Sequence, residues 1–316
     1  MLYSPTMAAV DLSTELCGIR LQNPTVLASG VLGTSKGLLK SVARAGAGAV
    51  TIKSLSLEPL PGHNNPIVVG FEAGMLNAVG YSNPGIKEGA KEFSNLKEVG
   101  VPVIASIIGR DVGDFMKVLE SALGGRGLGF AAVEVSLSCP HTPGYGMLAG
   151  QNTPEATKEI VSAVRKGTEL PLLVKLSPNI PEIGRVARAA EEAGADGITA
   201  VNTLGPGMLI NIEARQPILD FKVGGVSGAA LRPIALRCVY DIYKTVKIPI
   251  LGVGGISTGR HAIEMLMAGA SAVGIGTAVY SQGIEVFGKV CQEMEEWMEA
   301  NECTSVKELI GSAHAP

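Results

Sequence analysis

The chain has 316 residues and a formal net charge of −3, and 46% of its residues are apolar although only 4% are aromatic. The near-neutral charge argues against a nucleic-acid-binding or anionic-membrane-binding surface. The 5 cysteines follow no paired or Cys/His spacing, so no zinc, iron–sulfur or other metal site is expected within the chain. The start has neither the basic region nor the apolar run of a signal peptide, and no apolar stretch has membrane-spanning length. We therefore expect a soluble, cytoplasmic protein.

The first expected element is a small hairpin over residues 11–23, which would close the bottom of a barrel. Eight apolar runs bounded by turn residues follow it and are interpreted as buried strands. They cover residues 25–29, 49–53, 103–107, 132–136, 172–175, 197–201, 248–253 and 272–276. The clearer helices between them are expected at residues 41–45, 154–165, 182–193, 233–245 and 260–268.

A weak internal repeat indicates how these elements are arranged. Residues 43–53, 192–201 and 267–276 each contain a helix end, a glycine and an apolar strand. Glycine after a helix adopts the left-handed conformation that turns the chain into the next strand. Eight such units favour a closed (β/α)8 TIM barrel over an open doubly wound sheet, within one domain covering residues 1–316. Residues 204–227, after the sixth strand, are too long for a simple loop and predict an inserted strand pair or lid.

A cysteine follows the fourth predicted strand. Pro140 biases Cys139 away from helix, so the thiol is expected on an extended loop at the carboxyl end of a barrel strand. Active sites of such barrels lie at that end. A buried structural cysteine is the alternative, because free cysteine often packs as a small apolar residue.

Three glycine-rich loops follow the last three predicted strands, at residues 224–228, 252–257 and 274–277. Backbone N–H groups in such loops can approach a phosphate closely, so a phosphorylated cofactor or substrate is indicated. Each loop alone could be an ordinary turn.

Two lysines, Lys53 and Lys175, lie at predicted strand ends, where a buried ammonium needs an anionic partner. A barrel carboxylate could supply it, and so could a flavin, whose reduced ring carries negative charge near N1 and O2. The stretch from Asn77 to Gly85 adds two amides that could bind a planar ring of alternating carbonyl and N–H groups. It could also be an ordinary Asn-Pro-Gly turn.

These motifs occur together in one order: Lys53-Ser54, Asn77 to Pro84, Ser138-Cys139-Pro140, Lys175 to Asn179, Asn202-Thr203, Gly224 to Gly228 and Gly254-Gly255. Over nearly its whole length the chain resembles the class 1 dihydroorotate dehydrogenases, and most of all the heteromeric class 1B. The resemblance implies an FMN-containing (β/α)8 barrel that oxidises dihydroorotate to orotate in pyrimidine biosynthesis. Cysteine in the position of the base fits class 1, and the lack of an N-terminal membrane segment argues against the quinone-linked class 2.

The resemblance also implies roles for individual residues. Cys139 would remove the proton from C5 of dihydroorotate, while hydride passes from C6 to N5 of FMN. The substrate would be held by Lys53, Asn77, Ala78, Val79, Gly80, Tyr81, Ser136, Asn202 and Thr203. FMN would be held by Ser29, Lys53, Ser54, Ser106, Ser136, Lys175, Val201, Gly228, Gly254, Gly255, Gly276 and Thr277, with Lys175 beside N1 and O2.

Two positions depart from the usual motif, because Ser136 and His141 stand where asparagines are expected. Serine reaches less far, so water or a neighbouring side chain would have to replace the amide. Cys-Pro-His followed by Gly-Met and Gly-Gln also resembles the pyrimidine-reducing domain of dihydropyrimidine dehydrogenases, which act on uracil or thymine. A flavin-free phosphate-binding barrel remains a third possibility.

The chain has no cysteine cluster for an iron–sulfur centre and no dinucleotide-binding fingerprint, so the electron acceptor cannot be read from it. The resemblance implies a homodimer that assembles with an electron-transfer subunit carrying FAD and [2Fe–2S] into a heterotetramer that reduces NAD. An apolar stripe from Val286 to Met298 has helical spacing and is best explained as the last helix packing on the barrel.

Overall fold

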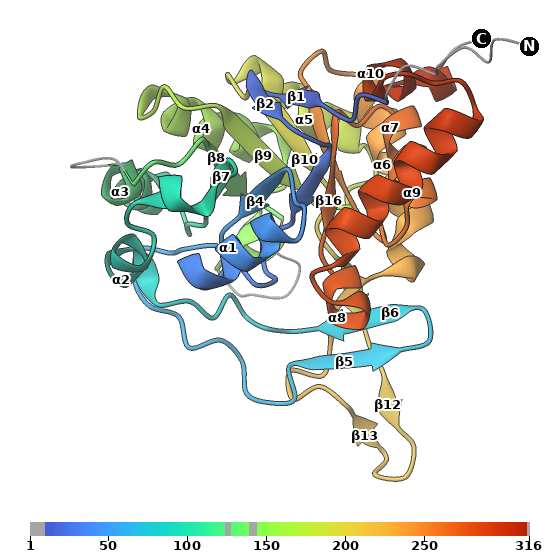
Figure 1. The fold of residues 1–316 in the computed structure, drawn as a ribbon. Helices are drawn as coiled ribbons and strands as arrows, with labels where there is room; N and C mark the ends of the chain where they lie inside the picture. The colour runs from blue at the N-terminus through green and yellow to red at the C-terminus, as the bar shows by residue number, and fades with distance from the viewer. Residues whose placement is uncertain (1–9, 124–127, 139–143, 315–316) are drawn as a thin grey trace, which may run out of the picture.

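The computed structural model describes residues 10–123, 128–138 and 144–314, and its centre is a closed barrel of parallel strands (Figure 1). The barrel strands are β3 (Thr25–Leu27), β4 (Ala49–Thr51), β7 (Val103–Ile107), β8 (Ala132–Ser136), β9 (Leu172–Leu176), β10 (Gly197–Ala200), β15 (Ile250–Val253) and β16 (Ala272–Ile275). β16 pairs with β3, which closes the ring. Each of the eight predicted strands is present in the predicted order, so the (β/α)8 barrel is confirmed.

Helices surround the barrel (Figure 1). Buried apolar side chains fill the space between the two layers. The outer helices are α1 (Lys36–Arg44), α2 (Gly85–Glu92), α3 (Val112–Leu123), α4 (Pro154–Lys166), α5 (Ile183–Glu192), α6 (Arg232–Tyr243), α7 (Gly259–Met267), α8 (Ala278–Gln282), α9 (Val286–Ala300) and α10 (Val306–Leu309). Helix α1 begins earlier than predicted, because the Ser35 hydroxyl accepts from the backbone N–H of Leu38 and caps it. None of the helices in the described ranges is long and apolar enough to cross a membrane.

The predicted N-terminal hairpin closes the amino-terminal end of the barrel. Strands β1 (Thr14–Leu16) and β2 (Ile19–Leu21) pair antiparallel. Leu16 and Leu21 are each 1% exposed and belong to one apolar cluster with Ala49, Ile104 and Leu173 of the barrel strands. The hairpin therefore plugs the bottom of the barrel, as its sequence predicts.

A second sheet lies at the opposite end of the barrel. Its strands, in spatial order, are β11 (Leu204–Gly207), β14 (Gly224–Ser227), β6 (Gly74–Asn77) and β5 (Val68–Phe71). The pair β12 (Ile210–Asn211) and β13 (Gln216–Pro217) extends beyond it (Figure 1). The insertion after the sixth barrel strand is thus confirmed, whereas β5 and β6 were not anticipated. Because β14 pairs with β6, the insertion is joined to the connection between β4 and β7.

The apolar stripe near the C-terminus forms one face of α9. Val286, Phe287, Val290, Met294 and Met298 are fully buried against the barrel. The stripe is therefore mostly packing within the chain, as expected, whereas Cys291 and Trp297 in the same helix are only partly buried.

Candidate active site

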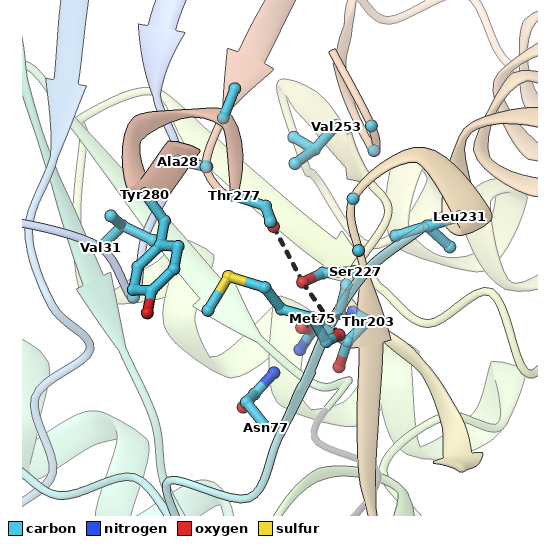
Figure 2. Close-up of a pocket in the computed structure, with 18 of the residues that line it drawn as sticks. Ala28, Val31, Met75, Asn77, Thr203, Ser227, Leu231, Val253, Thr277 and Tyr280 are labelled. Carbon is cyan, nitrogen blue, oxygen red and sulfur yellow. Dashed lines mark hydrogen bonds between the residues drawn. The ribbon is translucent and has the colours of Figure 1, made fainter. Parts of the chain in front are cut away.

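A cavity of about 830 Å³ opens at the carboxyl ends of the barrel strands. Its walls come from the segments that follow β3, β4, β10, β15 and β16, and from the ends of β8 and β9. The β5–β6 hairpin, β14 and α8 add further wall, in which Ser227 points toward Thr277 and the Met75 side chain extends toward Tyr280 (Figure 2). The cavity thus lies at the end of the barrel where the sequence places chemistry.

Most of the predicted site residues meet in this one cavity. Those that line it are Ser29, Lys53, Ser54, Asn77, Val79, Gly80, Tyr81, Ser136, Lys175, Val201, Asn202, Thr203, Gly228, Gly254, Gly255, Gly276 and Thr277. Ala78 and Ser106 do not line it, because both are completely buried behind the wall. Cys139 and His141 lie outside the residues that the structure describes.

The floor of the cavity carries a buried ammonium. Lys175, only 5% exposed, donates from Nζ to Ser29 Oγ at 2.9 Å. Its Nζ also lies 3.8 Å from a carboxylate oxygen of Glu134, which is 1% exposed. Lys175 therefore reaches the cavity and also has the barrel carboxylate that the sequence left as the alternative partner.

Ser106 belongs to a polar network behind this floor. Its hydroxyl lies 2.8 Å from Ser54 Oγ and donates to Glu134 Oε1 at 3.3 Å. Thr199 donates from Oγ1 to the other Glu134 oxygen at 2.9 Å. The predicted residue Ser106 thus contacts a wall residue, Ser54, rather than the cavity itself.

A tyrosine occupies the space beside the shortened side chain at position 136. Tyr81 Oη lies 3.2 Å from Ser136 Oγ. Tyr81 has a φ of 56°, and Asn83 Nδ2 donates to its carbonyl at 2.8 Å, which fixes this left-handed turn. The ring also packs edge-on against Tyr145, with centroids 5.9 Å apart. A neighbouring side chain, that of Tyr81, therefore lies within hydrogen-bond distance of Ser136.

Ser138, the residue before Cys139, is hydrogen-bonded to the segment that follows β10. Asn202 Nδ2 donates to Ser138 Oγ at 3.0 Å, and Ser138 is fully buried. The side-chain oxygen of Asn202 accepts from the backbone N–H of Thr203 at 2.8 Å. The start of the cysteine-containing loop is therefore fixed to the end of β10.

The glycine loops have the properties expected of a phosphate-binding site. Gly254 and Gly255 have φ values of 149° and 70°, and no protein acceptor for their N–H groups lies among the described residues. Thr277 donates to Ser227 Oγ at 2.8 Å, which joins two of the loops (Figure 2). A Cβ at Gly30 would meet no atom within 4 Å, so glycine there leaves room in the wall. These residues fit a phosphorylated planar cofactor such as FMN.

The four cysteines within the described residues do not line the cavity. Burial raises the pKa of Cys17 to about 12 and the pKa of Cys238 and Cys291 to about 11. These three thiols stay protonated near neutral pH and are structural.

Three contributors to the site were not identified from the sequence. Met75 and Tyr280 line the cavity, and Glu134 supports its floor. The available signal for the β5–β6 hairpin was the apolar run Ile67 to Val69 between Pro66 and Gly70, followed by a further glycine at Gly74. The role of Glu134 could not be predicted, because the sequence does not show that Lys175 of the neighbouring strand lies beside it.

The sequence is similar to those of known proteins over nearly its whole length. Residues 11–298 match the family described as Dihydroorotate dehydrogenase. The chain is 45% identical to "Dihydroorotate dehydrogenase B (NAD(+)), catalytic subunit" of Methanothermobacter thermautotrophicus, over 96% of this chain and 98% of that protein. Proteins with the same name from Methanocaldococcus jannaschii and Pyrococcus furiosus are 42% and 44% identical, over 98% and 96% of this chain and 100% and 99% of theirs.

Proposed function

The chain belongs to the dihydroorotate dehydrogenase family, and we propose that it is the catalytic subunit of an enzyme that oxidises dihydroorotate to orotate in pyrimidine biosynthesis. The observation that carries this proposal is the cavity, which gathers residues from seven barrel strand ends and from the inserted sheet. It is large enough for a cofactor and a small substrate together.

In this proposal Cys139 is the general base that takes the proton from C5 of the substrate. A thiol can serve because its pKa can be tuned toward neutrality by nearby positive charge or hydrogen-bond donors. Support comes from Ser138, whose contact with Asn202 fixes the start of the loop. Lys53 and the segment from Asn77 to Tyr81 hold the ring and carboxylate, and Asn202 and Thr203 close the site from the other side.

The proposed cofactor is FMN, which supplies the hydride acceptor for C6 when it is bound. Gly228, Gly254, Gly255, Gly276 and Thr277 are assigned to its phosphate, because these residues come from the glycine loops. Ser29, Ser54 and Val201 are assigned to the rest of the cofactor, and Lys175 is placed beside the N1/O2 edge. Lys175 then contributes a fixed positive charge that stabilises negative charge on the ring.

Electrons must leave this chain through a partner. The relatives are named as catalytic subunits of an NAD(+)-dependent enzyme. We assign FAD and [2Fe–2S] to a separate electron-transfer subunit, because the sequence has neither a cysteine cluster nor a dinucleotide fingerprint for them. The alternative, a subunit acting on uracil or thymine, is not favoured by the family match or by the names of the relatives.

The test is purification of the chain alone and with its candidate partner. Mass spectrometry of the denatured supernatant should recover FMN, noncovalently bound, from the chain alone. Dihydroorotate should then reduce artificial dyes without the partner and NAD only with it. Recovery of FAD or of no flavin, or NAD reduction by the chain alone, would contradict the proposal.

A further inference from the structure

One buried ionisable side chain near the cavity has no role in the proposed reaction. Glu134 is the third residue of β8, the strand that leads to Ser136 and then to Cys139. It is 1% exposed and does not line the cavity. Burying a carboxylate to this extent costs folding free energy unless charges and hydrogen bonds compensate it. The contacts that compensate Glu134 therefore indicate what the residue does.

The contacts of Glu134 come from three other barrel strands. Ser106 of β7 donates to Oε1 at 3.3 Å, and Thr199 of β10 donates to Oε2 at 2.9 Å. Lys175 of β9 places Nζ 3.8 Å from Oε1. These contacts compensate the carboxylate for the water that it loses on burial. Glu134 is thus a fixed negative charge behind the cavity floor.

Lys175 stands between this carboxylate and the cavity. Its ammonium is held from one side by Glu134 and from the other by Ser29 Oγ, at 2.9 Å. These two contacts, one from β8 and one from the segment after β3, leave the ammonium little freedom to turn away from the floor. The carboxylate also offsets part of the positive charge that Lys175 presents to any ligand above it.

Building on the proposed function, we propose that Glu134 is a positioning residue that holds the Lys175 ammonium against the flavin and sets the FMN reduction potential. The reduced ring is negatively charged near N1 and O2, so Lys175 raises the potential. Glu134, farther from the ring and of opposite charge, partly cancels this effect. The Lys175–Glu134 ion pair thus sets the reduction potential through two opposite charges at different distances from the flavin ring.

The test is the reduction potential of the FMN-loaded protein, measured by equilibration with a reference dye without substrate. Glu134→Gln removes the negative charge but keeps a side-chain oxygen that faces Lys175, and Ser29 Oγ still accepts from the ammonium. Lys175 therefore stays in place in this variant, and the potential should rise. The ratio of reduced to oxidised FMN at a fixed applied potential should increase on the order of tenfold. Lys175→Met should lower the potential. Thr199→Val is the matched control, because it removes a hydrogen bond to Glu134 without changing formal charge, and its shift should be smaller.

A potential that stays constant or falls in Glu134→Gln would overturn the inference. If that variant does not fold, Glu134→Gln/Lys175→Met removes both charges together, which buried pairs tolerate better than loss of one partner. Its potential should fall below that of the wild type, because the lost ammonium is nearer the ring, and a potential equal to or above wild type would contradict the proposal. A wild-type protein without FMN would refute the proposed function, whereas a flavin reduced by dihydroorotate but insensitive to Glu134 refutes only this inference.

Discussion

At the scale of single residues, the Tyr81–Ser136 contact shows how a departure from the family motif is accommodated. The two hydroxyls lie 3.2 Å apart at the cavity wall, where the usual motif has one asparagine amide. Either oxygen can donate, so the pair can supply a donor and an acceptor to a bound ligand. We infer that the pair takes over part of the recognition that the asparagine would provide.

Tyr81→Phe tests this inference. Loss of one hydrogen bond costs about 0.5–1.5 kcal/mol, so orotate binding should weaken about 3- to 10-fold. FMN content should stay unchanged, because the ring that packs on Tyr145 is retained. Calorimetric titration of the FMN-loaded protein with orotate measures the effect. An unchanged orotate affinity would show that the hydroxyl takes no part in binding.

Cys139 is assigned to proton transfer and not to cofactor binding. Cys139→Ala should slow reduction of the flavin by dihydroorotate about 10²- to 10⁴-fold near neutral pH while FMN stays bound. Cys139→Ser should retain some activity that rises at high pH, because a hydroxyl gives up its proton less readily than a thiol. Stopped-flow absorbance checks both variants.

The control for this experiment is Cys303→Ser. Cys303 Sγ donates to the carbonyl of Ser305, a contact that serine can keep, and Cys303 does not line the cavity. This variant should reduce its flavin at the wild-type rate. Equal rates in Cys139→Ala and wild type would exclude the role of Cys139.

Residues near strand ends were predictable from the sequence because the barrel brings those ends together. Ala78 and Ser106 were assigned to the site but lie behind its wall, since sequence position alone does not give the direction of a side chain. Glu134 was missed for a related reason. A charge inside an apolar strand has meaning only when Lys175 is known to face it from the neighbouring strand.

At the scale of elements, glycines in the loops serve two different purposes: some are required by packing against a helix, and others leave space in the cavity. A Cβ at Gly254 would collide with the Cβ of Ala235 on α6, and its φ of 149° is unfavourable for other residues. A Cβ at Gly276 would lie 3.7 Å from Ala28, at ordinary contact distance, beside two cavity-lining residues, Ala28 and Val31. Gly254 is therefore required by packing, whereas Gly276 leaves space within the cavity.

We therefore expect alanine substitution at these two glycines to have different effects on stability and on FMN binding. Gly254→Ala should destabilise the protein by about 1–3 kcal/mol through overpacking and strain. Gly276→Ala should change stability by less than about 0.5 kcal/mol but weaken FMN binding. Thermal unfolding with and without added FMN, together with FMN titration, separates the effects. Equal loss of stability in both variants would show that the loops serve packing alone.

The barrel strands were predictable because each is a local apolar run, and because β4, β10 and β16 each follow a helix end and a glycine. The β5–β6 hairpin was not, because its strands are only partly buried and lack a regular pattern of apolar residues. Its place in the fold depends on pairing with β14, about 150 residues later in the chain. Helix α1 extends beyond its predicted start because a single hydroxyl, that of Ser35, caps it.

At the scale of the whole molecule, the proposed reaction requires a route by which electrons leave the chain. Most of the apolar stripe of α9 is buried against the barrel and is not available to a partner. We predict a homodimer when the chain is expressed alone and a heterotetramer with the electron-transfer subunit. Sedimentation of the purified chain, with and without that subunit, measures both states, and strictly monomeric behaviour would contradict the assignment to class 1B.

The most direct test of the central claim is anaerobic mixing of the FMN-loaded chain with dihydroorotate, followed by the visible absorbance of the flavin. The account predicts that the absorbance bleaches, that one orotate forms per flavin reduced, and that dihydrouracil in a parallel experiment leaves the flavin oxidised. Bleaching by dihydrouracil, or a flavin that dihydroorotate does not reduce, would contradict it.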